Sequence, residues 1–119
     1  VKMVDWAIKN TIGGEIIVPK IPSYNIVNLA KAICEKCKIK YVGIRPGEKL
    51  HEDLITITDS PNTYDLGSYY AILMKDSKKL VSYYKGRKAK KVENNFSYNS
   101  KNNKKFKNIN ELRKLIKNL

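Results

Sequence analysis

The sequence has no apolar run that approaches the roughly 20 residues needed to span a bilayer. It also shows no signal peptide, because its first ten residues include the charged Lys2, Asp5 and Lys9. At 119 residues and 42% hydrophobic content, the chain is long enough for one domain with a modest core. These features predict a cytoplasmic protein without a membrane span.

Cysteine and histidine are scarce, with 2 and 1 in the chain. Cys34 and Cys37 form a C-x-x-C pair, but a zinc site needs four ligands, and His51 cannot complete one with them. A redox pair is favoured at a helix start, where thiolates are stabilised, whereas this pair lies at the end of a helical pattern. We therefore expect two reduced cysteines that pack against a helix, and no metal site.

Acidic residues are also few, with 11 Asp and Glu against 24 Lys and Arg, for a net charge of +13. The first 75 residues hold ten basic and eight acidic residues, whereas residues 76–119 hold fourteen and three. The excess therefore lies in a Lys- and Asn-rich tail, which is usually a solvated face. Aromatic residues interleave with these lysines, as single-strand nucleic-acid binding would require: Tyr83, Tyr84, Phe96, Tyr98 and Phe106.

Apolar periodicity divides the chain into short helices and strands. Helical spacing predicts helices over residues 1 to about 10, 26–37, 47–54 and about 109–119. Runs rich in β-branched or aromatic residues predict strands at 15–19, 39–44 and 69–74. Ser23 or Asn25 would cap the second helix, and Asn108 or Asn110 the last.

These elements predict an α/β fold. The unbroken apolar run of residues 16–18 suits a strand that is buried on both faces, as in a parallel sheet. Residues 76–108 show no firm period. We therefore expect a first part, residues 1–75, followed by a basic C-terminal extension, residues 76–119, that ends in a helix.

The most specific local pattern is Arg45-Pro46-Gly47-Glu48. Pro46 restricts one backbone angle and Gly47 leaves the next one free, so the turn can be tight. An Arg and a Glu three residues apart face the same side. A guanidinium can hold two phosphate oxygens, and a carboxylate can accept hydrogen bonds from a pair of sugar hydroxyls. Arg45 and Glu48, called the handle below, are thus candidates for binding a nucleotide-sugar, although a surface ion pair has the same spacing.

The predicted elements on both sides of the handle favour the same interpretation. The strand 39–44 would deliver the chain to Arg45, and ligands of open α/β sheets lie beyond the carboxyl ends of strands. The helix predicted from Gly47 would add its positive N-terminal end to the attraction for a diphosphate. His51 is expected to pack or to cap rather than to act as an acid or base.

Four stretches, in order, resemble the C-terminal part of the nucleotide-sugar 4,6-dehydratases, which belong to the extended short-chain dehydrogenase/reductase family. They are residues 14–23 (GEIIVPKIPS), 43–52 (GIRPGEKLHE), 63–73 (TYDLGSYYAIL) and 96–100 (FSYNS), followed by Phe106 and the last helix. The closest group acts on UDP-N-acetylglucosamine and makes 4-keto-6-deoxy sugars, with or without inversion at C5, for surface polysaccharides, capsule and glycans. The resemblance implies the substrate-binding part of a Rossmann-type fold.

By this resemblance, Arg45 would bind the diphosphate and Glu48 the ribose hydroxyls of UDP. Val18, Pro19 and Lys20 would lie near the uracil, with Lys20 a candidate phosphate contact, whereas Val18 and Pro19 equally suit plain strand termination. In the intact enzyme, NADP takes a hydride from C4 of the sugar, water leaves across C5–C6, and the hydride returns to C6. The intact enzyme is expected to form a homo-oligomer.

The chain lacks two features of such an enzyme. It has no Gly-rich turn for a dinucleotide, only the isolated pair Gly13-Gly14. Its one Tyr-x-x-x-Lys match, Tyr84 to Lys88, follows the handle instead of preceding it, so we do not interpret it as catalytic. We therefore expect no catalytic residue and no bound cofactor here, and an N-terminal dinucleotide-binding domain that is absent. The alternatives are a small nucleic-acid-binding protein that uses the basic tail, or an inactive structural remnant.

Overall fold

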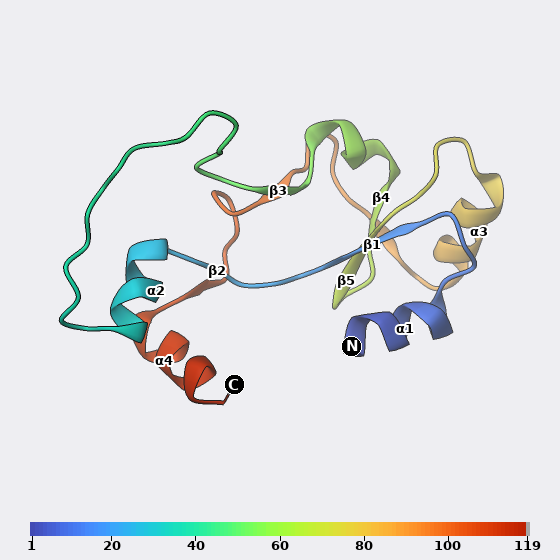
Figure 1. Cartoon of the computed structure of the whole chain (residues 1–119). Helices are drawn as coiled ribbons and strands as arrows, with labels where there is room; N and C mark the ends of the chain where they lie inside the picture. The colour runs from blue at the N-terminus through green and yellow to red at the C-terminus, as the bar shows by residue number, and fades with distance from the viewer. Residues whose placement is uncertain (119) are drawn as a thin grey trace. The chain divides into compact units, whose positions relative to one another are not determined.

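The computed structural model describes residues 1–118, which form two compact units. Unit 1 consists of Val1–Lys20 and Asp53–Tyr98, and unit 2 of Ile21–Glu52 and Asn99–Leu119. Each unit thus combines two stretches that are distant in the sequence (Figure 1). These bounds differ from the expected parts 1–75 and 76–119, because segments after residue 76 pair with earlier ones in both units.

A four-stranded sheet forms the centre of unit 1. Its strands are β1 (Ile16–Pro19), β5 (Tyr69–Ile72), β4 (Thr63–Asp65) and β6 (Lys90–Lys91), in that order. All three pairings are antiparallel, so the expected parallel sheet is wrong. β1 lies at the edge of the sheet, where Val18 is buried but Ile16 is 64% exposed. The apolar run marked a strand correctly, but it did not reveal that only part of the strand is covered.

Unit 1 also contains α1 (Lys2–Asn10), β3 (Asp53–Ile55), a 3₁₀ helix η1 (Ile57–Asn62) and α3 (Lys78–Gly86). The sequence did not reveal α3, because only Leu80 and Tyr84 of this Lys-rich helix are buried. β3 pairs with β7 (Tyr98–Asn99). No helix among residues 1–118 has the length and apolar character needed to cross a membrane.

Two groups of buried side chains form the core of unit 1. One consists of Tyr64, Ala71, Leu73, Leu80 and Tyr84, and the other of Val18, Ile55 and Tyr98. The Tyr84 hydroxyl donates a hydrogen bond to Glu15 Oε1 at 2.8 Å. Burial, together with this carboxylate, raises the pKa of Tyr84, so the hydroxyl remains a donor.

Unit 2 contains two helices and a two-stranded parallel sheet. β2 (Ser23–Tyr24) pairs with β8 (Phe106–Lys107), and α2 (Ile26–Ile33) packs against α4 (Ile109–Lys117). Asn25 accepts hydrogen bonds from two amides at the start of α2, as one of the two expected caps. The expected end of the last helix, Leu119, lies outside the described residues.

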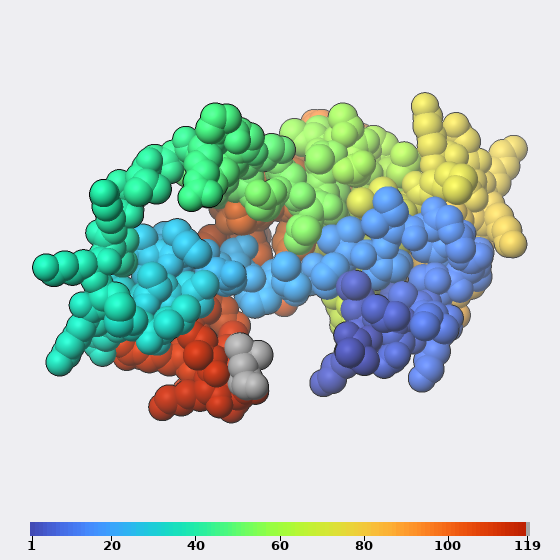
Figure 2. Space-filling view, in the orientation of Figure 1, coloured from blue at the N-terminus to red at the C-terminus, as the bar shows by residue number. Residues whose placement is uncertain are grey.

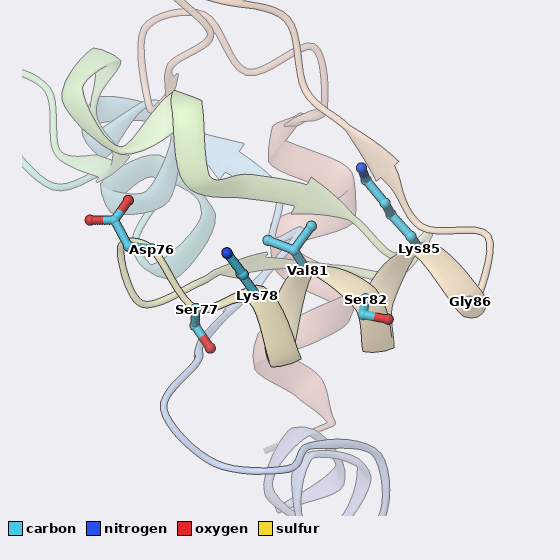
Figure 3. Close-up of a pocket in the computed structure, with 7 residues that line it drawn as sticks. All are labelled: Asp76, Ser77, Lys78, Val81, Ser82, Lys85 and Gly86. Carbon is cyan, nitrogen blue, oxygen red and sulfur yellow. The ribbon is translucent and has the colours of Figure 1, made fainter.

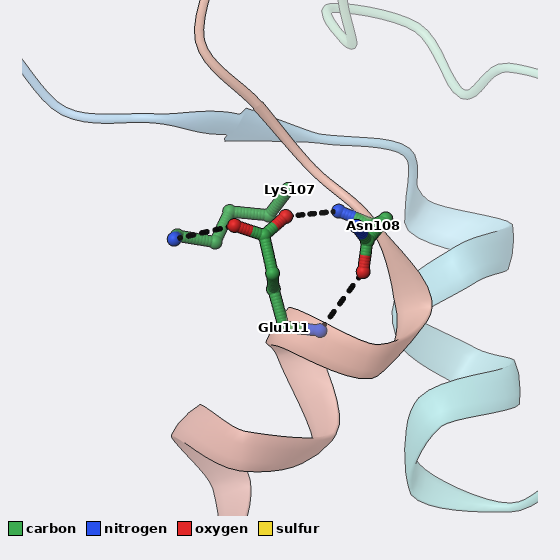
Figure 4. Close-up of polar contacts among 3 residues, drawn as sticks. All are labelled: Lys107, Asn108 and Glu111. Carbon is green, nitrogen blue, oxygen red and sulfur yellow. Dashed lines mark hydrogen bonds and ion pairs between the residues drawn. The ribbon is translucent and has the colours of Figure 1, made fainter.

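The capping of α4 is reciprocal (Figure 4). The Asn108 side chain accepts a hydrogen bond from the backbone N–H of Glu111 at 2.9 Å. The Glu111 carboxylate accepts one in return from the backbone N–H of Asn108, also at 2.9 Å. This backbone donor, with Lys107, lowers the pKa of Glu111. Two of the amides that a helix start leaves unpaired are thereby satisfied.

Residues 34–52 differ most from the prediction, because the strand expected at 39–44 and the helix expected at 47–54 are both absent. Leu50 and Leu54, the apolar residues of that helix, are 78% and 42% exposed. A helix this short is not stable without a surface against which its apolar face can pack, and an isolated strand likewise requires a partner.

The expected pair of reduced cysteines is wrong as well, because Cys34 and Cys37 form a disulfide. α2 ends at Ile33, so Cys34 has an extended backbone and Cys37 follows in a turn. Their Cα atoms are 5.4 Å apart, which a disulfide can bridge. The cysteines therefore do not share one helix face, as the longer predicted helix would require.

We expect Asn108→Ala to lower the free energy of unfolding by about 1 kcal/mol, because it removes the cap of α4. The matched control is Asn110→Ala, since Asn110 is exposed and was the alternative cap. Urea denaturation of the two variants checks this prediction. An equal loss in both variants would contradict a specific capping role for Asn108.

Candidate functional site

The handle is a tight turn in which Arg45 and Glu48 contact each other. The backbone N–H of Arg45 donates to Glu48 Oε2 at 3.0 Å, and the backbone N–H of Glu48 donates to the Arg45 carbonyl at 3.0 Å. Arg45 Nε lies 3.8 Å from Glu48 Oε1. Gly47 has a φ of +84°, which a residue with a Cβ rarely adopts. The spacing argument thus placed the two side chains together correctly.

Both side chains of the handle face solvent, with exposed fractions of 80% for Arg45 and 52% for Glu48. Among residues 1–118, the Nη groups of Arg45 make no hydrogen bond and can meet a phosphate. Glu48 retains lone pairs for further donors. The expected contribution of a helix dipole is absent, because no helix follows Gly47. An exposed ion pair of this kind adds little stability.

Ser100 connects the end of the handle segment to the C-terminal part of unit 2. Its hydroxyl lies 3.2 Å from His51 Nδ1 and accepts a hydrogen bond from the backbone N–H of Glu52 at 3.1 Å. The Ser100 backbone N–H donates to the Glu52 carbonyl at 3.0 Å. His51 is exposed and linked to a residue 49 positions away, so it is not packed in a core. The sequence alone does not identify Ser100 as a partner of this segment, because no local pattern predicts a contact over that distance.

The other three predicted site residues lie at the end of β1 in unit 1. The Val18 side chain belongs to the core, and Pro19 pairs in register with Tyr69. Lys20 Nζ lies 2.6 Å from Asp65 Oδ1 and 4.4 Å from the centre of the Tyr70 ring. Lys20 is therefore already neutralised by a carboxylate. The structure brings Val18, Pro19 and Lys20 together in one unit and the two handle residues together in the other.

The residues present do not fit a dinucleotide cofactor. Gly13-Gly14 lies between α1 and β1, which is a helix-to-strand connection, whereas the dinucleotide motif is a strand-to-helix turn. No step of a reaction can therefore be assigned to a cofactor held by these glycines. Within residues 1–118, no three His, Cys, Asp or Glu side chains are grouped to hold a metal ion.

A hollow of about 660 Å³ lies beside α3 in unit 1. Figure 3 shows Lys78, Val81 and Lys85 on the same side of this helix, with Ser77 at its start. Tyr84 and Tyr98 are buried, and Phe96 packs against the second core group, so these rings do not offer free faces for base stacking. The basic tail thus provides charge here without most of its predicted stacking surface.

The fold matches a solved structure, Pen from Bacillus thuringiensis, with a TM-score of 0.77 and 27% sequence identity. The match covers 98% of this chain and 35% of that one. It confirms the predicted α/β class, that of the C-terminal part of an extended short-chain dehydrogenase/reductase.

The sequence profile of the polysaccharide biosynthesis protein family matches residues 1–74, and the chain belongs to this family. It is 45% identical over 111 residues to the UDP-N-acetylglucosamine 4,6-dehydratase (inverting) of Campylobacter jejuni strain 81-176, a match over 87% of this chain and 33% of the relative. It is 37% identical over 120 residues to the UDP-glucose 4-epimerase of Rickettsia akari, over 98% and 35%. The chain thus spans about a third of the length of the curated relatives it matches.

We expect Lys20 and Asp65 to be coupled by about 0.5–1 kcal/mol, the upper range for a partly exposed ion pair. A double-mutant cycle with Lys20→Met and Asp65→Asn, followed by urea denaturation, measures this coupling. Asp65→Asn preserves Oδ1 as the acceptor for the Gly67 N–H, so the cycle isolates the charge. A coupling near zero would mean that Asp65 does not hold Lys20 in place.

Proposed function

We propose that this chain is the UDP-sugar-binding C-terminal part of a nucleotide-sugar 4,6-dehydratase that acts on UDP-N-acetylglucosamine. The observation that carries the proposal is the solvent-facing handle, whose Arg45 guanidinium and Glu48 carboxylate are arranged for a diphosphate and a ribose. In this role the chain contributes binding energy and orientation, and it holds the sugar for chemistry performed elsewhere in the protein.

The names of the relatives support binding of the UDP end in particular. The dehydratase and the epimerase named above differ in reaction, but both names specify a UDP-sugar. A segment that both enzymes share is best explained by the part of the substrate that they share. The higher identity to the dehydratase, 45% against 37%, favours the dehydration reaction for the intact protein.

The position of β1 supports a role for Val18 and Pro19 near the uracil. β1 is an edge strand, and its second edge has no strand partner within residues 1–118. Backbone N–H and C=O groups on such an edge are free to bond the polar edge of a base. Val18 would act through its backbone, since its side chain is buried. Lys20 would reach a phosphate only by leaving Asp65, so we rank it below Arg45.

The intact protein would include a dinucleotide-binding domain for NADP and would form a homo-oligomer in the cytoplasm. Its product would be a 4-keto-6-deoxy sugar for a surface polysaccharide or capsule. The alternative of nucleic-acid binding by the basic tail is less favoured, because burial of Tyr84 and Tyr98 removes two of its stacking surfaces. An inactive remnant would bind neither UDP nor an oligonucleotide.

We expect Arg45→Ala to weaken UDP binding by about 1.5–3 kcal/mol, the usual value for a hydrogen bond to a charged group. Isothermal titration of the chain with UDP provides the measurement. Lys49→Ala is the matched control, because Lys49 is an exposed cation in the same turn. An equal effect of the two substitutions would show general charge attraction instead of a specific contact.

Glu48→Gln should weaken binding of UDP and leave the salt dependence of the affinity nearly unchanged, because the carboxylate contacts hydroxyls instead of phosphate. Titrations with UDP and with 2′,3′-dideoxy-UDP at two salt concentrations test this role. The variant should discriminate less between the two ligands, because the Gln amide offers one acceptor oxygen where the carboxylate offers two. If discrimination is unchanged, Glu48 does not bind the ribose.

A further inference from the structure

Residues 38–44, called the free segment below, have the sequence of a strand but no strand partner. They contain Ile39, Tyr41, Val42 and Ile44, of the β-branched and aromatic types that favour strands. Tyr41 and Val42 are 80% and 75% exposed. Within residues 1–118, no backbone hydrogen bond involves the free segment. Figure 1 draws this green stretch as a tube without helix or strand, and Figure 2 shows its side chains in the space-filling view.

Such a segment is favourable for β-pairing. Its unpaired N–H and C=O groups can continue the ladder of another sheet, and its apolar side chains can be buried at the same time. An extended apolar stretch that stays in water gains neither the hydrogen bonds of a sheet nor the burial of its apolar side chains. The combination of a strand-forming sequence and unpaired backbone groups therefore indicates a surface that another polypeptide segment covers.

Charge and length indicate which polypeptide this is. Residues 36–45 contain Lys36, Lys38, Lys40 and Arg45 without an acidic residue, so pairing with a second copy would bring two cationic segments together. The curated relatives, in contrast, extend well beyond the matched region, which is 33–36% of their length. The partner that fits the free segment is an edge strand of the remaining family polypeptide, with neutral or acidic side chains beside the lysines.

We infer that the free segment pairs with an edge strand of the remaining family polypeptide and thereby fixes the handle for UDP. Arg45 follows Ile44 directly, so pairing would orient the residue that bears the guanidinium. In the chain alone, the handle is held mainly by its own turn and by Ser100 beyond it. The ligand in this inference, UDP, rests on the proposed function. The pairing of the free segment does not depend on that function. Docking and UDP binding would strengthen each other by the same factor.

The test compares this chain with a chimaera in which it replaces the matched third of the Campylobacter jejuni dehydratase. Hydrogen exchange of residues 38–44 should be at least about 100-fold slower in the chimaera than in the chain alone, as in a paired strand. UDP, the probe for the handle, should bind about 10-fold more tightly to the chimaera, within the usual range of coupling.

Proline substitutions locate the pairing. Consecutive N–H groups of a strand point to opposite edges, so at least one of Tyr41→Pro and Val42→Pro should remove the protection and the gain in UDP affinity. Val42→Thr, which retains the N–H and the β-branched shape, is the control and should preserve both. In the chain alone, neither proline should change UDP affinity. The exchange comparison of the unsubstituted proteins decides the inference if a proline variant does not fold.

The outcomes separate the inference from the proposed function. Protection without UDP binding would support the interface and contradict the proposed function. UDP binding with an unprotected free segment would overturn the inference and leave the proposed function intact. Protection in the chain alone that rises with its concentration, together with a dimer by sedimentation, would overturn the inference in favour of pairing between copies.

Discussion

The antiparallel pairing of β1 with β5 is the interaction on which unit 1 depends. It joins the first 20 residues to a strand about 50 positions later, with Val18 opposite Tyr70 and Ile17 opposite Ala71. Ala71 is fully buried and belongs to one core group, while Val18 belongs to the other. The Tyr70 ring contacts Lys20, Phe96 and Tyr98, so the same pairing positions the predicted phosphate contact.

The handle is held in a different way. Short hydrogen bonds between neighbouring residues shape the turn, and Ser100 ties the chain a few positions beyond it. Arg45 and Glu48 are both exposed, and neither packs against the two core groups described above. A recognition element with so little support can bind well only when another surface fixes it, because ordering a loose loop opposes binding. This is the physical reason to connect the handle with the free segment beside it.

The similarities to a dehydratase and to epimerases are consistent with the proposed function, in which this chain binds the nucleotide and another part of the protein performs the reaction. A family that varies its reaction can retain one means of holding the nucleotide, since binding groups and reacting groups lie on different parts of the polypeptide. The structure presents an exposed guanidinium beside a carboxylate and an edge strand with free backbone groups. Both offer groups that can hydrogen-bond or pair with a nucleotide, as the proposed function requires.

Local sequence patterns were sufficient to predict α1, two candidate caps for each of α2 and α4, and the contact between Arg45 and Glu48, because each depends on residues within a few positions. The structure then identified Asn25 and Asn108 as the caps. Similarity over nearly the whole chain likewise showed its family. The tertiary structure alone decided that β1 is an antiparallel edge strand and that Lys20 is held by Asp65, 45 residues away. It also decided that residues 39–44 do not form a strand and that residues 47–54 do not form a helix, the last two of them belonging to β3 instead. Local propensity cannot supply these results, because a strand needs a partner and a short helix needs a surface to cover it.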